Sequence, residues 1–338
     1  MSENLKPDPS PSGAEKPQAD SDPGREPQSE ISCFLKAAPV FLQPWWLEAV
    51  APGRHEYVLV RRGEEIACAM PLVRDEAAGH NLVMPKLTQV LGPWLRPSSA
   101  ANTRKLASET SLLCELVESL PDFRSFRQNF HFQITNWLPF YWAGFRQTTR
   151  YTYVLPELTD LDRVWGNLAG NTRTDIRKAA KSIEVSQTDD LDLFLEINAR
   201  TFQRQGKSLP YSREYVGRID DCLERRNARV ILVARDRAGR PHAVLYLIWN
   251  EHSAYYLMGG ADPDLRSSGA QKLLLWEAIR FAAGVTASFD FEGSMIRGVE
   301  ASFRSFGAEQ RPYFSINRPS APGRLTGLVN KLRKRLTR

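Results

Sequence analysis

The chain has 338 residues, of which 42% are hydrophobic and 25% are charged, so it is an ordinary globular protein large enough for two cores. No apolar run approaches the roughly 18 residues that a membrane span needs, and the N-terminus lacks the apolar core of a secretion signal. We therefore expect a cytoplasmic protein. Its net charge of +6 comes mainly from the end of the chain, because residues 318–338 hold seven basic residues and no acidic one.

The four cysteines, Cys33, Cys68, Cys114 and Cys222, lie far apart in the sequence. They form no Cys-x-x-Cys motif, and no histidine lies at metal-ligand spacing from them. This pattern predicts a reducing compartment with unpaired, mostly buried thiols and no metal site.

The first 30 residues are rich in proline and serine and hold seven acidic and three basic residues. With almost no large apolar side chain, they cannot bury enough surface to offset the entropy of ordering. We predict a disordered acidic segment over residues 1–30.

The globular part opens with a short helix over residues 44–50, whose first turn contains Pro44. A β-hairpin follows over 56–74, then an amphipathic helix whose apolar set includes Leu112 and Leu116. Alternating Phe130, Phe132 and Ile134 predict a strand, and a second strand is expected over 147–154.

The second part of the chain has a similar order of expected elements. A helix at 213–225 leads to strands at 229–235, 242–249 and 255–258, then to further elements, namely a helix at 271–282, a strand at 288–292, a helix at 298–306 and a strand at 311–316. The similar order, and the similar sequences near the two ends, indicate a degenerate internal duplication. Chance similarity between two α/β halves is the alternative.

The apolar run at 255–258 is broken by Gly259 and Gly260 and leads through a polar turn at 261–269 into the Leu-rich helix. The first N–H groups of a helix lack intrahelical partners and carry partial positive charge, so such a turn suits a phosphate. Helix capping by Ser267 or Ser268 is the simpler alternative.

Arg266 and Gly269 fall on the pattern Arg/Gln-x-x-Gly-x-Gly/Ala, with Gln271 in place of the last small residue. In its order of elements and in this turn, the region resembles the acyl-CoA-binding half of the GNAT acyltransferase fold. The resemblance implies that the donor's phosphates are held by the residues of the turn, Arg266, Ser267, Ser268, Gly269 and Ala270. The first half lacks this turn, because its counterpart contains Pro97 and no glycine.

The segments 271–279, 289–295 and 302–307 resemble more closely the FemAB-like, or BioF2-like, branch of that superfamily. This branch uses the fold for acyl and aminoacyl transfer to cell-envelope precursors, and its members have two GNAT-like halves. The implied fold is α/β (α+β), with tandem GNAT-like units at 31–155 and 156–318, mixed central sheets flanked by helices, and catalysis in the second unit.

A predicted helix from Asn171 carries Arg173, Arg177 and Lys181 at i, i+4 and i+8, with Lys178 beside them. This basic face can bind a phosphate of the substrate, or it can simply be solvated. The motif resembles the one that opens the second half of FemAB-like sequences. We therefore interpret Arg173, Arg177 and Lys178 as candidate substrate-binding residues.

Asp290 and Glu292 lie two apart on a predicted strand and should point to one face. Acyl transfer to an amine needs no protein nucleophile, but it needs positioning and a proton acceptor. We expect Glu292 to be the base and Asp290 to share that role or to orient the substrate, while salt bridges to nearby basic residues are the structural alternative. Tyr255, Tyr256 and Tyr313 are candidates to protonate the leaving thiolate, and packing in a strand with the hydroxyl hydrogen-bonded is the structural alternative.

Members that use aminoacyl-tRNA commonly have a Phe-Lys-x-x-Phe-Gly pattern. Here Phe303 stands at the lysine position and Arg304 follows it, so Arg304 is a candidate substrate-binding residue with different chemistry. The departure lowers the expectation of a tRNA donor.

The C-terminal segment 319–338 mixes basic and apolar residues at roughly helical spacing. It can lie on an anionic membrane surface, touch RNA, or remain an unstructured basic tail. Peripheral attachment to the inner membrane face is therefore one expectation for this segment.

Together these features predict an N-acyltransferase that moves an acyl group from acyl-CoA, without a metal, to an amine of a cell-envelope or polysaccharide precursor. The alternatives are an aminoacyl-tRNA-dependent peptidyltransferase acting on a peptidoglycan precursor, and a non-catalytic binding protein with the same fold.

Overall fold

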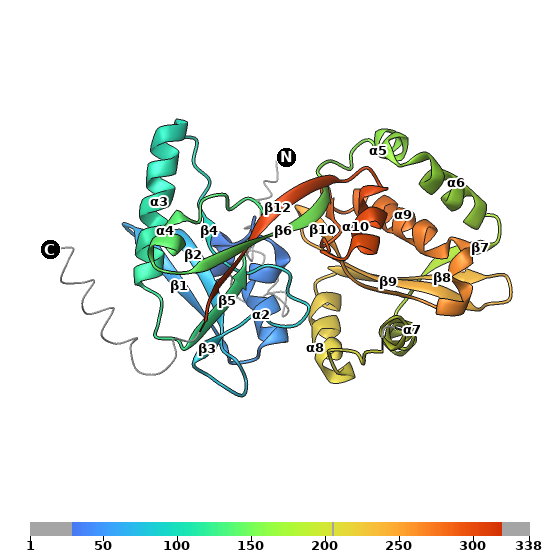
Figure 1. Ribbon diagram of the computed structural model, residues 1–338, viewed down its shortest axis with the longest axis horizontal. Helices are drawn as coiled ribbons and strands as arrows, with labels where there is room; N and C mark the ends of the chain where they lie inside the picture. Colours follow the sequence, from blue (N-terminus) through green and yellow to red (C-terminus); the bar gives the residue numbers. More distant parts are fainter. Residues whose placement is uncertain (1–28, 205, 320–338) are drawn as a thin grey trace, which may run out of the picture.

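The computed structural model describes residues 29–204 and 206–319 (Figure 1). The predictions for residues 1–28 of the acidic segment and for 320–338 of the basic tail lie outside the described residues. No helix in the described ranges is long and apolar enough to cross a membrane. The four cysteines, all described, form no disulfide bond.

The first half contains short helices, a small sheet and the beginning of a large sheet. Its elements are α1 (Glu30–Phe34), the 3₁₀ helix η1 (Val40–Leu42), α2 (Pro44–Val50), β1 (His55–Arg62), β2 (Glu65–Val73), β3 (Asn81–Leu82), β4 (Trp94–Leu95), α3 (Asn102–Glu118), β5 (Ser125–Asn129), α4 (Leu138–Trp142) and β6 (Arg146–Leu155).

The second half contains the rest of the large sheet and the helices that cover it. Its elements are α5 (Leu161–Asn167), α6 (Gly170–Ala179), β7 (Ile183–Thr188), α7 (Leu191–Gln203), α8 (Arg213–Glu224), β8 (Arg229–Asp236), β9 (Pro241–Trp249), β10 (Ser253–Ala261), η2 (Pro263–Ser268), α9 (Ala270–Ala283), β11 (Ser288–Asp290), α10 (Arg297–Arg304) and β12 (Glu309–Arg318). The predicted mixed α/β class is confirmed.

The two halves share one nine-stranded sheet with the order β3-β5-β12-β6-β11-β10-β9-β8-β7, while β1, β2 and β4 form a separate sheet. The last strand of each half joins the sheet of the other half, because β12 pairs with β5 and β6 pairs with β11. The two exchanged strands also pair with each other along nearly their whole length (Figure 1). The halves therefore meet at the centre of a continuous sheet, and the division at residue 155 stays a prediction.

Helices cover both faces of the second-half sheet (Figure 1). Helix α9 packs on one face with the apolar residues of α6 and α10. Helices α7 and α8 pack on the other face, and α2 of the first half belongs to the same hydrophobic core, in which Trp46 is fully buried. This shared core fixes the first half against the second.

Strand β10 continues through Gly259 and Gly260, so the prediction that these glycines break the strand is wrong. A Cβ atom on Gly260 would lie 2.6 Å from the Cα atom of Asn198 on α7. The Asn198 side chain donates a hydrogen bond of 2.7 Å to the Gly259 carbonyl. The glycines thus allow α7 to approach the strand closely.

Two other predicted strands are wrong in extent or place. The first-half strand predicted around Phe130 lies earlier, at β5, and residues after Asn129 form turns and loops. Strand β11 ends at Asp290 instead of continuing to Glu292, because Glu292 has a left-handed φ of 54°.

Candidate active site

Strand β11 runs parallel to β10 and pairs along its whole length with the first residues of β10. Ser253 lies opposite Ser288, Ala254 opposite Phe289 and Tyr255 opposite Asp290, and β10 continues beyond these three pairs. On its other side, Asp290 lies opposite Val154 of β6. Residues opposite one another share a face of the sheet, so Tyr255, Asp290 and Val154 point to the same side.

Asp290 is a buried carboxylate, only 4% exposed, held by two hydrogen bonds. Its Oδ1 atom accepts from the Thr152 hydroxyl at 2.5 Å and from the Glu292 backbone N–H at 2.8 Å. Burial raises the pKa of Asp290 to about 6, although these hydrogen bonds oppose the rise. The group therefore titrates just below neutral pH, which suits a proton acceptor.

Glu292 lies beside Asp290, but in an irregular segment. The segment runs so close to β6 that a Cβ atom on Gly293 would overlap the Tyr151 carbonyl oxygen. The Oε1 atom of Glu292 is buried without a hydrogen-bond partner among the described residues. Burial, followed by the nearby charge of Asp290, raises the pKa of Glu292 well above its usual value, so a second negative charge beside Asp290 is disfavoured.

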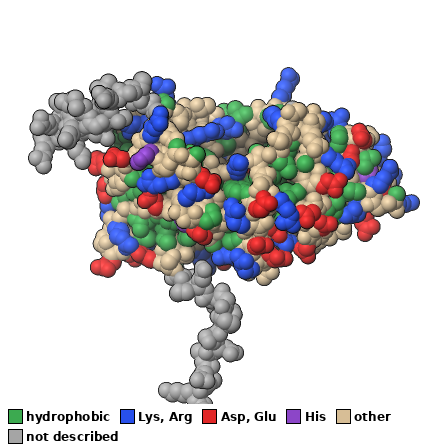
Figure 2. All heavy atoms as spheres, turned by 90° about the horizontal axis from the view of Figure 1, so that it is seen from below, with side chains coloured by type: hydrophobic (Ala, Val, Ile, Leu, Met, Phe, Trp, Pro, Cys, Tyr) green, Lys and Arg blue, Asp and Glu red, His purple; other side chains and the backbone are tan. Residues whose placement is uncertain are grey.

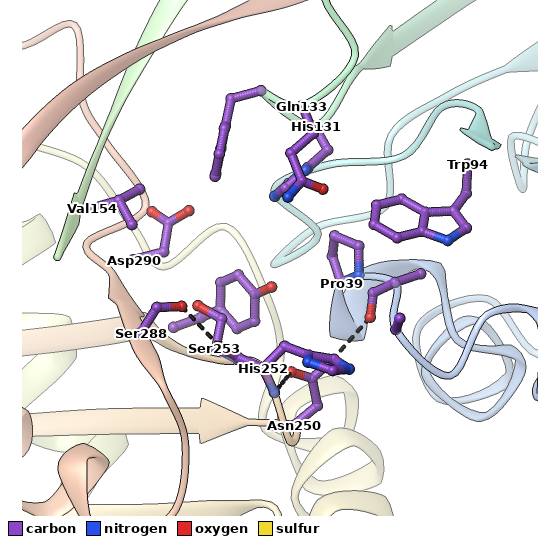
Figure 3. A pocket seen from close by; sticks show the side chains of 14 residues that line it. Pro39, Trp94, His131, Gln133, Val154, Asn250, His252, Ser253, Ser288 and Asp290 are labelled. Carbon is purple, nitrogen blue, oxygen red and sulfur yellow. Dashed lines mark hydrogen bonds between the residues drawn. The ribbon is translucent and has the colours of Figure 1, made fainter. Parts of the chain in front are cut away.

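A cleft of about 140 Å³ lies in front of Asp290, at the junction of the two halves (Figure 3). We call it the junction cleft. Figure 3 shows Asp290 and Trp94 on opposite sides of it, with His131 between them. The first half contributes Pro39, Trp94, His131 and Gln133, and the second half contributes Asn250, His252, Tyr255 and Asp290. Glu292 is not among the lining residues.

Two tyrosines near the acidic pair differ in their surroundings. Tyr255 lines the junction cleft, and burial, followed by the nearby Asp290 carboxylate, raises the pKa of its hydroxyl. The Tyr313 hydroxyl accepts a hydrogen bond of 3.2 Å from Arg150 Nε, and burial raises its pKa as well. Both remain protonated at neutral pH, and of the two Tyr255 is placed at the cleft.

The predicted phosphate turn forms the 3₁₀ helix η2, followed by Gly269 at φ 75° and by α9. Arg266 and Ser267 are exposed, and no ion pair of Arg266 is found within residues 29–204 and 206–319. Ala270, in contrast, is buried, and its N–H donates to Ser268 Oγ at 3.3 Å. Arg266 and Ser267 are therefore accessible to solvent, whereas Ala270, where α9 begins, is not.

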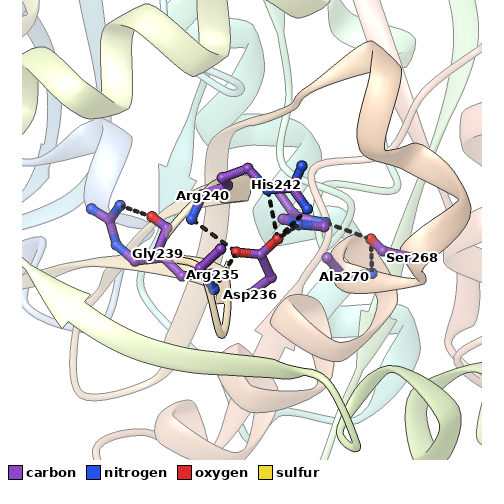
Figure 4. Close-up of polar contacts among 8 residues, drawn as sticks. Arg235, Asp236, Gly239, Arg240, His242, Ser268 and Ala270 are labelled. Atoms are coloured by element: carbon purple, nitrogen blue, oxygen red, sulfur yellow. Dashed lines mark hydrogen bonds and ion pairs between the residues drawn. The ribbon is translucent and has the colours of Figure 1, made fainter.

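Ser268 is also engaged on its other side (Figure 4). The Nε2 atom of His242 lies 3.2 Å from Asp236 Oδ2, and a carboxylate only accepts, so Nε2 carries the proton. The Nδ1 atom of His242 lies 2.9 Å from the Ser268 hydroxyl oxygen. These hydrogen bonds attach the turn to the β8–β9 hairpin.

Helix α6 lies across the start of α9. A Cβ atom on Gly269 would lie 3.3 Å from both Ala179 Cβ and the Asp175 carbonyl oxygen. Lys272 forms an ion pair of 2.7 Å with the Asp175 carboxylate. The start of α9 is thus covered by α6, while Arg266 and Ser267 remain exposed.

The candidate basic residues mostly contact the protein itself. Arg173 donates to the carbonyls of Gly166 and Leu168, at the end of α5, and Arg177 lies over the Trp165 ring. Arg304 pairs with Glu300 at 2.8 Å. Lys178 is exposed.

Over the face seen in Figure 2, basic and acidic side chains are intermixed. A continuous basic surface of the kind that follows a nucleic-acid backbone is not visible on that face. Among the described residues, no group of three His, Cys, Asp or Glu side chains is placed to hold a metal ion.

Sequence reasoning missed Trp94, His131 and Thr152. Trp94 and His131 belong to the half in which we expected no site, and their sequence surroundings carry no motif. The link from Thr152 to Asp290 spans 138 positions and depends on strand exchange, so no local pattern could have revealed it.

Residues 169–301 match the family model of an acetyltransferase (GNAT) domain. The structure is similar to that of FemX, with a TM-score of 0.63 and 14% identity over 91% of this chain and 98% of that chain. A conserved protein of unknown function from Bacteroides thetaiotaomicron has a TM-score of 0.50, with 14% identity over 85% of this chain and 92% of that one.

A tandem GNAT protein from the clavulanic acid biosynthesis pathway has a TM-score of 0.48, with 12% identity over 81% of this chain and 86% of that one. No curated protein sequence matches the chain significantly.

Proposed function

We propose, from the premise that the chain is an acyltransferase of the GNAT superfamily with a FemX-like fold, that it transfers an acyl group from acyl-CoA to a primary amine. The observation that carries the proposal is the buried Asp290 carboxylate, with a pKa of about 6, in the junction cleft. The acceptor amine binds in this cleft. That the amine belongs to a cell-envelope or polysaccharide precursor rests on the resemblance to FemAB-like sequences.

The reaction needs one proton acceptor and one proton donor. The neutral amine attacks the thioester carbonyl, so that a C–N bond forms while the C–S bond breaks. The amine proton passes to the Asp290 carboxylate, and the Tyr255 hydroxyl supplies a proton to the leaving thiolate. The two groups lie opposite each other on neighbouring strands, so both reach the same reacting centre.

Asp290 is a better candidate for the base than Glu292. Glu292 keeps its proton because it is buried beside a charged neighbour, and it does not line the cleft. Its role is to keep the charge of the pair at one and to fix Asp290 through its backbone N–H.

The donor enters along β10. Its phosphates lie at Arg266 and Ser267, and its thioester reaches Asp290 where β10 and β11 part. Ala261 lies six positions after Tyr255 in the strand, a span of about 20 Å that the extended arm of the donor must cover. Since Phe303 stands at the lysine position of the tRNA-using pattern, we prefer acyl-CoA to aminoacyl-tRNA.

A thiol-release assay with acetyl-CoA and a panel of primary amines tests the proposal. We expect amine-dependent release of CoA thiol and a mass increase of one acetyl group on the amine, both unaffected by ribonuclease. A thermal-shift series with CoA and acetyl-CoA should raise the unfolding temperature, since a ligand that binds only the folded state stabilises it. Absence of both thiol release and any thermal shift would contradict the acyl-CoA assignment.

A further inference from the structure

The junction cleft has a charge pattern that restricts what it can bind. In the described part of the chain, Asp290 is the only Asp, Glu, Lys or Arg side chain among its lining residues. An ammonium group is attracted to Asp290, whereas a carboxylate about 5 Å away meets repulsion equivalent to about a hundredfold loss of affinity at an effective dielectric constant near 20. No lysine or arginine side chain among the described residues lines the cleft to offset that repulsion.

His131 gives the cleft a second polar group. The side chain is 8% exposed, and its Nδ1 atom is buried without a hydrogen-bond partner in residues 29–204 and 206–319. Trp94 and Phe132 fix the imidazole, with ring centroids at 6.2 Å and 4.1 Å. Burial lowers the pKa of His131 to about 4, so at neutral pH the ring is uncharged and offers one donor and one acceptor nitrogen.

Unpartnered buried polar groups are rare, and they cost stability unless a ligand or water satisfies them. His131 lies between Trp94 and Asp290 (Figure 3), and all three line the same cleft. The volume of about 140 Å³ is close to that of a cavity that holds benzene, so the cleft admits a group about as large as one ring.

We propose that the junction cleft selects a primary amine with an uncharged hydrogen-bonding group, a hydroxyl or an amide carbonyl, next to the amine, and that His131 recognises this group. The inference rests on the proposed function, since the amine is the acyl acceptor. The inference defines the acceptor class further. The part of the acceptor that enters the junction cleft carries no carboxylate or phosphate, as in an amino sugar or an amino-acid amide. Anionic parts of a larger acceptor remain outside the cleft.

Calorimetric titration of the full chain at pH 7.5, without any thioester, tests binding separately from catalysis. Alaninamide and alanine form a matched pair that differs in the carboxylate. Glucosamine and glucosamine 6-phosphate form a second pair that offers a hydroxyl in place of a carbonyl. We expect at least one uncharged member to bind at least about tenfold tighter than its anionic partner.

His131→Phe should lower the affinity for the preferred amine about three- to tenfold, the usual contribution of one hydrogen bond, without lowering the unfolding temperature. His131→Asn, which keeps a hydrogen-bond donor and an acceptor, should lose less of the affinity for this amine than His131→Phe. His80→Phe, an exposed histidine of the same half, is the matched control and should leave the affinity unchanged.

Equal or tighter binding of the anionic partners, or unchanged affinity in a folded His131→Phe variant, would overturn the inference. Selective binding without any release of CoA thiol contradicts the proposed acyl transfer but supports the inference about the cleft. Transfer to amines that show no such selectivity supports the transferase and overturns the inference.

Discussion

The connection from β4 to α3 in the first half and the connection from β10 to α9 in the second occupy the same place in the order of elements, but they differ in what they leave exposed. In the first, Arg96 donates to the Ile66 carbonyl at 2.9 Å and pairs with Glu65, and Ala101 caps α3 without a side-chain hydrogen bond. In the second, Gly269 adopts a left-handed conformation before α9 and Arg266 is exposed.

This difference separates two tasks. The first half uses its arginine to fix its own strands, while the second half keeps a cation and a positive-φ glycine at a helix start. The first half also lines the side of the junction cleft that contains Trp94 and His131. In our account, the second half thus provides a donor turn and the first half provides the acceptor side of the cleft.

The largest effect is expected from Asp290→Asn, which keeps the oxygen that accepts from Thr152 but removes the base. We expect kcat/KM for acyl transfer to fall by about 10²- to 10⁴-fold, the usual contribution of general base catalysis. Glu292→Gln, which replaces an already neutral side chain, should cost tenfold or less. Asp122→Asn, at an exposed site in the first half, is the control and should leave kcat/KM unchanged. A Glu292→Gln variant as inactive as Asp290→Asn would move the base to Glu292.

The halves should also differ in how their buried titratable groups affect stability. The pKa of Asp290 is raised to about 6, so its contribution to stability is lost as pH rises from about 4 to 6. The pKa of His131 is lowered to about 4, so its contribution is lost as pH falls from about 6.5 to 4. Each contribution to the free energy of unfolding amounts to about 3 kcal/mol at most. In the native chain the two contributions change in opposite directions with pH.

Urea unfolding of folded single variants across pH 4 to 7 separates these contributions. Asp290→Asn should become more stable as pH rises through this range, and His131→Phe should become less stable. Parallel curves for the two variants and the native chain would mean that neither group titrates as its burial implies.

A smaller effect should distinguish the two connections. Arg266→Ala is expected to weaken binding of CoA about tenfold, because it removes one charge-assisted hydrogen bond to a phosphate. Arg96→Ala should leave CoA affinity unchanged, since Arg96 is occupied by Ile66 and Glu65. Equal losses in both variants, measured by calorimetry, would contradict the assignment of the donor turn to the second half.

Much of the fold could be predicted from local sequence because local physics determines it. The helix at residues 44–50 starts with a proline that its first turn tolerates, and its predicted bounds are those of α2. The Leu-rich helix is confirmed as α9. The wrong predictions at Gly259 and Gly260 arise from a distant partner, because only the approach of α7 explains why glycines stand inside a strand.

The site could be predicted only in part for the same reason. The proximity of Asp290 and Glu292 follows from their spacing, and they are neighbours, although an irregular segment and not strand alternation brings them together. The shared face of Arg173 and Arg177 also follows from helical spacing. Tertiary packing brings the carbonyls at the end of α5 to Arg173, so these partners could not be predicted from the sequence.

The most direct test of the central claim, that Asp290 accepts the proton in the junction cleft, is the pH dependence of kcat/KM for acyl transfer in the native chain and in Thr152→Val. Our account predicts a half-maximal value near pH 6 in the native chain, with activity lost below it. It also predicts an upward shift of about one unit in the variant, because the hydrogen bond that favours the charged form of Asp290 is removed. A profile without a transition between pH 5 and 7.5, or one with the same midpoint in both proteins, would contradict the account.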